Sequence, residues 1–214
     1  MTPSKLSQWA GMAAMVAGVS YVIVGLFHPL NELASTDTRT WINVHYFACA
    51  MAFFGIFGMV GLYVRQAEQS GWLGLAGFVM LGLWMGLVLG FSFVEAFVLP
   101  ELGAVAPRFV EGLMAMFTAP IDGIDLGILP TMWLVSGPLY ILGGLVFGIA
   151  TFRAAVLPRW SGALLAFGTA ISPVAALFPF AYQAKVTIPV GLALVWMGYA
   201  LWSETRVSTA AVPA

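Results

Sequence analysis

Six apolar stretches, each about long enough to cross a lipid bilayer, fill most of this 214-residue sequence. A transmembrane helix needs roughly 20 consecutive apolar residues. The stretches are apolar all round rather than on one face, and only 8% of the residues are charged. They cover residues 9–27, 41–64, 72–99, 130–152, 160–178 and 186–202. Because backbone in lipid must satisfy its own hydrogen bonds, the sequence predicts an all-α, polytopic transmembrane bundle of six helices.

The same pattern excludes several classes of protein. Six spans leave only short connectors, so residues 1–214 are expected to form a single transmembrane domain without a large catalytic domain outside the membrane. A net charge of −1 lacks the basic surface that nucleic-acid binding requires. The first stretch has no small-residue cleavage site and predicts a retained helix rather than a signal peptide. The expected partners are the lipid bilayer and, for an accessory subunit, a larger membrane complex.

Basic residues are unevenly divided between the connectors. With six spans both termini lie on one side, which collects five basic residues against three on the other. The first set is Lys5, Arg65, Arg153, Arg159 and Arg206, and the second is Arg39, Arg108 and Lys185. Because Lys and Arg are enriched in cytoplasmic loops, the bias predicts cytoplasmic termini. The inverted orientation stays open, because the bias is small.

Short segments recur in a way that suggests repetition. A Trp-X-Gly segment opens the first, third and fifth stretches, at residues 9–11, 72–74 and 160–162. This pattern predicts three repeated helical hairpins, as in transporters built from parallel repeats. Interfacial tryptophans also arise independently in any bundle, so chance similarity is the alternative.

Rows of glycine predict where helices approach one another closely. Such rows lie on the first, third and fourth stretches: Gly11, Gly18 and Gly25; Gly82, Gly86 and Gly90; and Gly144 and Gly148. Small residues let helix backbones pack closely in lipid, where no hydrophobic force drives helices together. We expect these rows to pack within the chain, with a dimerisation face as the alternative.

The longest connector carries an amphipathic pattern over residues 107–120. Phe109, Leu113, Met116 and Phe117 recur at helical spacing. The segment predicts a short amphipathic outer helix between the third and fourth spans, whose apolar face rests on the bundle. A lid over a site is the alternative to a simple interfacial helix.

Three ionisable residues are expected at one level of the bundle, near its outer side. His28 and His45 each lie about 19 residues from the opposite end of their spans, and Glu95 lies at a comparable height. Ionisable groups at membrane depth are costly and usually face the interior or a cavity. The predicted site is therefore a polar cluster of these three side chains.

The chemistry of such a cluster has several interpretations. Two imidazoles and a carboxylate suit a divalent first-row metal bound by His28, His45 and Glu95, and the two imidazoles alone suit a haem. Tyr21, on the face of His28, and Asp122 and Asp125, in the outer connector, are predicted to support the ligands. A purely structural role, with each imidazole bonded to backbone or to Glu95, is the leading alternative, and a proton or cation relay through Glu95 is another.

Several segments resemble a known family. They are His45, the Gly-Leu-Tyr-Val-Arg-Gln-Ala-Glu run at 61–68, the Phe-Val-Glu-Ala-Phe-Val-Leu-Pro run at 93–100 and the Arg-Ala-Ala-Val-Leu-Pro-Arg-Trp-Ser-Gly run at 153–162. The chain thereby resembles an uncharacterised family of small bacterial integral membrane proteins. The resemblance implies a six-helix bacterial membrane protein and supplies no activity or catalytic residue. We expect the chain to lie in the bacterial cytoplasmic membrane.

The sequence thus predicts architecture in more detail than function. The leading hypothesis is a small membrane protein without evident catalytic chemistry, such as an accessory subunit, with the His28, His45 and Glu95 cluster near the outer side. A haem- or metal-binding protein and a proton-coupled or small-solute carrier are the alternatives.

Overall fold

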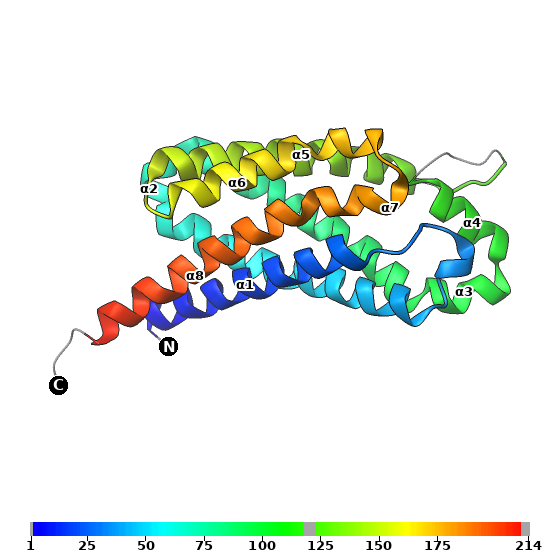
Figure 1. Cartoon of the computed structure of the whole chain (residues 1–214), viewed down its shortest axis with the longest axis horizontal. Helices are drawn as coiled ribbons and strands as arrows, with labels where there is room; N and C mark the ends of the chain where they lie inside the picture. The colour runs from blue at the N-terminus through cyan, green and yellow to red at the C-terminus, as the bar shows by residue number, and fades with distance from the viewer. Residues whose placement is uncertain (1, 118–122, 211–214) are drawn as a thin grey trace.

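All regular structure in the computed structural model is helical, over the residues that it describes, 2–117 and 123–210. The longer helices are α1 (Pro3–Phe27), α2 (Arg39–Phe97), α5 (Leu129–Ala154), α6 (Arg159–Ala170) and α8 (Ile188–Ala210). The short helices are α3 (Leu99–Val105), α4 (Pro107–Ala115) and α7 (Phe180–Gln183), and the 3₁₀ turns are η1 (Leu33–Ser35), η2 (Ser172–Leu177) and η3 (Ala184–Thr187). The long helices lie side by side, and α3 and α4 sit at one end of the bundle (Figure 1).

The long helices are compatible with a membrane protein. Four segments in the described part of the chain are long and apolar enough to cross a bilayer: Pro3–Phe27, Arg39–Phe97, Leu129–Ala154 and Ala184–Glu204. Large apolar side chains also cover the outside of the bundle, with Phe57 54% exposed and Leu134 75% exposed. A continuous apolar exterior of this kind is unfavourable in water and matches lipid acyl chains.

Helix α2 doubles back on itself at Gly71. Gly71 has φ 53° and ψ −147°, a conformation that glycine adopts without steric cost. A straight helix of 59 residues would be roughly 88 Å long. Instead, the indole Nε1 of Trp41 donates a hydrogen bond to the carbonyl oxygen of Glu95 at 2.8 Å. The halves 39–70 and 72–97 are therefore antiparallel neighbours, seen in Figure 1 as the cyan segment that returns in green.

The predicted fifth stretch, residues 160–178, is not one continuous helix. Helix α6 ends at Ala170, and the chain continues as the 3₁₀ turn η2. Pro173 lies in this turn, where its missing N–H group and its ring oppose a further α-helical turn. The 12 residues of α6 rise only about 18 Å, which is shorter than the hydrocarbon core of a bilayer.

Two of the three glycine rows pack within the chain, as expected. A Cβ atom placed on Gly11 would lie 2.7 Å from the carbonyl oxygen of Gly198, and Gly18 meets Gly191 in the same way. These contacts form the seam between α1 and α8, the glycine seam. The α5 row also packs, with a Cβ on Gly148 at 2.5 Å from the carbonyl oxygen of Gly162 in α6. Close backbone approach therefore joins α1 to α8 and α5 to α6.

The third row departs from the expectation of packing within the chain. A Cβ placed on Gly82, Gly86 or Gly90 would meet nothing within 4 Å. These glycines lie in the second half of α2, whose contacts with α5 use other positions. Gly77 approaches the backbone of Phe147, and Gly143 lies against Leu81. The row at 82–90 is thus an open strip on the helix surface.

The predicted amphipathic segment forms helix α4 and covers one end of the bundle. Val110, Leu113 and Met114 of α4 are buried against Trp41 and Leu99. Phe109, which was expected on the buried face, is 39% exposed. The part of the prediction that falls on residues 118–120 lies outside the described residues. The threefold hairpin repeat stays a prediction.

Candidate functional site

The three ionisable residues predicted to share one level do meet in space. His28 follows the last turn of α1, His45 lies near the start of α2, and Glu95 lies near its end. The reversal of α2 at Gly71 brings His45 Nε2 to 3.4 Å from Glu95 Oε2. The His28 and His45 rings are in edge-to-face contact with centroids 5.3 Å apart. All three lie beside the end of the bundle that α3 and α4 cover.

Hydrogen bonds fix which nitrogen of each imidazole faces the cluster. His45 Nδ1 lies 2.7 Å from the carbonyl oxygen of Trp41, and His28 Nδ1 lies 2.8 Å from that of Pro29. A carbonyl oxygen only accepts, so each Nδ1 donates, and Nε2 of the neutral ring is an acceptor. Both imidazoles thus bond to backbone, as the structural alternative predicted. His45 Nε2 nevertheless remains buried without a hydrogen-bond partner.

The protonation of His28 follows from its position just outside α1. Burial lowers the pKa of its imidazole from the ordinary value of 6.5, and the hydrogen bond to the carbonyl of Pro29 opposes this effect only in part. The ring is therefore mainly neutral at pH 7. It adds a hydrogen-bond acceptor, rather than a positive charge, to the cluster.

Trp41 joins the parts of the site, and the sequence analysis did not identify this role. Its indole N–H bonds to the backbone of Glu95, its carbonyl oxygen accepts from His45, and its ring lies 4.2 Å from the His45 ring. Trp41 is completely buried. The spacing of four residues between Trp41 and His45 was the available signal, because it allows an imidazole to bond the carbonyl one turn earlier.

A cavity of about 200 Å³, the histidine pocket, lies beside these side chains. Its polar residues include His28, His45, Glu95 and Asn31, together with the hydroxyl-bearing Tyr21, Ser92 and Thr187. The side-chain oxygen Oδ1 of Asn31 is buried and has no hydrogen-bond partner. Aromatic residues form much of the wall, namely Tyr21, Trp84, Phe91, Phe117 and Trp133. The pocket therefore combines unpartnered acceptors with aromatic faces.

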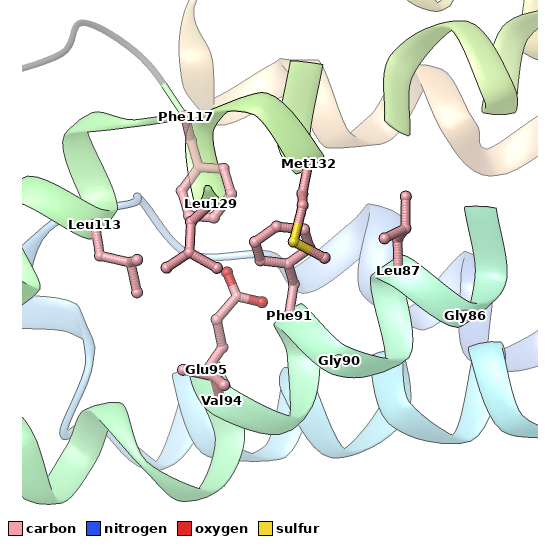
Figure 2. A pocket seen from close by; sticks show the side chains of 10 residues that line it. All are labelled: Gly86, Leu87, Gly90, Phe91, Val94, Glu95, Leu113, Phe117, Leu129 and Met132. Atoms are coloured by element: carbon pink, nitrogen blue, oxygen red, sulfur yellow. The ribbon is translucent and has the colours of Figure 1, made fainter. Parts of the chain in front are cut away.

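A second hollow of about 260 Å³, the apolar cavity, lies on the other side of Glu95. Its lining comes from the second half of α2, from α4 and the residues that follow it, and from the start of α5: Gly86, Leu87, Gly90, Phe91, Val94, Glu95, Leu113, Phe117, Leu129 and Met132. Figure 2 shows the Glu95 carboxyl group pointing into this space among apolar side chains. Glu95 is the one ionisable residue of this lining among the residues that the structure describes, and it also lines the histidine pocket.

The residues predicted to support the cluster differ in whether the structure places them near it. Tyr21 does line the histidine pocket, where its ring stacks on Trp84 with centroids 6.1 Å apart. Asp125 is exposed, and its carboxylate accepts a hydrogen bond from the backbone N–H of Gly127 within its own turn. The structure does not bring Asp125 to the cluster. Asp122 lies outside the described residues.

The two predicted cofactors fit this geometry to different degrees. A haem bound by both histidines would need a porphyrin between the imidazoles, and rings in edge-to-face contact at 5.3 Å leave no room for one. For a metal, the Nδ1–H bonds to carbonyls do orient Nε2 as in metal-binding histidines. However, the described part of the chain contains no group of three or more His, Cys, Asp or Glu residues that could hold a metal ion. The described residues therefore leave no room for a haem clamped between the two imidazoles and show no three-ligand metal group.

Comparison with known proteins finds no matching family model, curated protein or solved structure. The resemblance to a family of small bacterial membrane proteins thus stays a prediction. The functional argument rests on the site itself.

Proposed function

We propose that this protein is a ligand-binding membrane protein whose histidine pocket takes a primary amine in its cationic form. The observation that carries the proposal is the pair formed by His45 Nε2, which is buried and unpartnered, and Glu95 Oε2 at 3.4 Å. With Glu95 ionised, these two acceptor atoms face one another, and neither can donate a hydrogen bond to the other. A ligand that donates hydrogen bonds would remove this deficit, because unpaired buried polar groups are costly.

The charge of the pocket favours a cation over a neutral or anionic ligand. A buried carboxylate requires a positive or hydrogen-bond-donating partner. Among the described residues, no Lys or Arg lines the histidine pocket, and the basic side chain that contacts Glu95 is the neutral imidazole of His45. The walls include Trp84 and Trp133, whose ring faces attract cations.

The number of acceptors favours a primary amine among cations. A primary ammonium group has three N–H donors. His45 Nε2, Glu95 and Asn31 Oδ1 offer three sets of acceptor atoms around one pocket. A quaternary ammonium has no donor and would leave all of them unpaired.

The proposed setting is a bacterial cytoplasmic membrane that the chain crosses six times. The halves of α2 supply two crossings, and α6 with η2 supplies another, since their combined rise is about 30 Å. The start of α1 and the end of α8 lie at the same end of the bundle (Figure 1). We place this end in the cytoplasm on the bias of basic residues, which puts the histidine pocket near the outer side. The role proposed is binding rather than catalysis, and it suits a small-solute carrier or an accessory subunit.

Equilibrium dialysis with radiolabelled n-butylamine tests the proposal. The protein would be held in nanodiscs of zwitterionic lipid, so that the bilayer itself does not attract the amine. We expect one saturable site, weakened about 10- to 100-fold in Glu95→Gln, because a charge-assisted hydrogen bond contributes about 1.5–3 kcal/mol. Glu101→Gln is the matched control, since Glu101 is an exposed carboxylate at the same end of the bundle.

Two results would contradict the amine proposal. One is the absence of saturable butylamine binding to the unmodified protein, or equal binding by Glu95→Gln. The other is about one equivalent of a first-row metal in the purified protein that is lost in His45→Ala, which would assign the pocket to a metal ion instead.

A further inference from the structure

We infer that the amine is carried by a single-chain amphiphile, with its head at Glu95 and its alkyl chain in the apolar cavity. This inference rests on the proposed function and adds the class of ligand. It is carried by the continuity of the two hollows, by the open glycine strip and by the position of the Glu95 carboxyl group between the two hollows.

The histidine pocket and the apolar cavity meet at shared residues. Phe91, Glu95 and Phe117 line both. One side of Glu95 therefore faces imidazole and amide acceptors, and the other faces aliphatic and aromatic carbon. A molecule that occupies both hollows must be polar at one end and apolar at the other.

The glycine strip gives the apolar cavity its opening. Gly86 and Gly90 line it, both are exposed at the helix surface, and a Cβ on either would meet nothing within 4 Å. In a membrane this surface faces lipid, so the cavity can be entered sideways from the bilayer. Side chains at these two positions would occupy the space that an alkyl chain needs.

The head of the amphiphile is what the site can recognise. Lipid is as apolar as the cavity wall, so an alkyl chain gains little by moving from the bilayer into the protein. The gain must come from the head, which pairs with Glu95 in a low-dielectric setting. Neither hollow is lined by Lys or Arg within the described residues, which disfavours fatty acids and phosphate-bearing lipids.

Photolabelling in zwitterionic nanodiscs tests the inference. The probe is dodecylamine with a diazirine at the far end of its chain, and the adducts are mapped by mass spectrometry of peptides. We expect adducts on Leu87, Leu129 and Met132, which line the apolar cavity. The corresponding alcohol should label these residues at least about fivefold less, because it lacks the charge.

Two glycine variants test the apolar cavity, where the alkyl chain is proposed to lie, separately from the amine site at Glu95. Gly90→Leu should reduce labelling of the cavity at least about fivefold and weaken butylamine binding by a smaller factor, because a four-carbon chain fills less of the cavity than a twelve-carbon chain. Gly82→Leu is the matched control, because Gly82 lies on the same open strip but outside the cavity lining. A Cβ atom at either position meets nothing within 4 Å, so we expect both variants to fold.

The outcomes distinguish this inference from the proposed function. Glu95-dependent butylamine binding together with adducts scattered over the lipid-facing surface would overturn the amphiphile and leave the amine site standing. If Gly90→Leu leaves the labelling of the cavity unchanged, the amphiphile inference is also overturned. Native mass spectrometry provides a further arm, since a dimer that Gly90→Leu abolishes would show that a second copy of the chain fills the strip. Loss of butylamine binding itself would instead remove the proposed function.

Discussion

The glycine row of α1, which repeats every seven residues, and the row in the second half of α2, which repeats every four, both lie along one side of a helix and have opposite surroundings. Gly11 and Gly18 form the glycine seam, where a Cβ on Gly11 would lie 2.7 Å from the backbone of α8. Gly82, Gly86 and Gly90 have open space within 4 Å of the same constructed atom. The spacing of small residues therefore permits close packing without determining whether a partner helix arrives.

Within the described parts of the chain, no helix packs on the α2 row, because α2 and α5 meet along another face. Gly77 and Gly143 provide the close approaches there, against Phe147 and Leu81 respectively. This leaves the open strip free to border the apolar cavity beside Glu95. One row has a structural use, and for the other we propose a binding use.

The substitution with the largest expected effect is Gly18→Leu in the glycine seam. Its side chain would run into the backbone of Gly191 and Val195, so α1 and α8 would have to separate. We expect a loss of about 3 kcal/mol or more in the free energy of unfolding. Unfolding by SDS titration, followed by circular dichroism, measures it. Stability equal to that of Gly82→Leu would show that the seam does not hold the two helices together.

A smaller substitution in the same seam should still be costly. The methyl group of Gly11→Ala would lie 2.7 Å from the carbonyl oxygen of Gly198, which cannot move without its helix. We expect a loss of about 1–3 kcal/mol in the same titration. An unchanged midpoint would mean that the α8 backbone shifts freely at this point.

Trp41→Phe tests the hydrogen bond that joins the two halves of α2, which are not held by a glycine seam. The change removes the indole donor to the carbonyl oxygen of Glu95, a buried bond of 2.8 Å. We expect a loss of about 1 kcal/mol in the free energy of unfolding and weaker butylamine binding, since Glu95 is less well held. Trp72→Phe is the control, because Trp72 is 84% exposed. If the two variants unfold alike, the bond contributes nothing measurable.

Gly82→Ala should have the smallest effect, with the opposite sign. Its methyl group meets nothing within 4 Å, and alanine restricts the unfolded chain more than glycine does. We expect a gain of between 0 and about 1 kcal/mol where Gly11→Ala loses stability. Destabilisation by Gly82→Ala would indicate that this row has a packing partner after all, such as a second copy.

Some of the site followed from counting residues along the sequence. Helical rise placed His28, His45 and Glu95 at one level, and the structure brings the three side chains together. Counting does not give direction across a bundle. It therefore did not show that Asp125 turns back to its own backbone, or that Asn31 adds an unpartnered oxygen from the loop after α1.

The sequence by itself determined that the chain is helical and suited to lipid, because apolar length is a local property and backbone in lipid must bond within its own segment. The tertiary structure decided which glycine row acquires a partner and which one stays open. It also decided that Trp41 hydrogen-bonds to the backbone of Glu95, 54 residues further along the chain. These features depend on which helix faces meet, and that choice is made by the packing of the whole bundle rather than by any one segment.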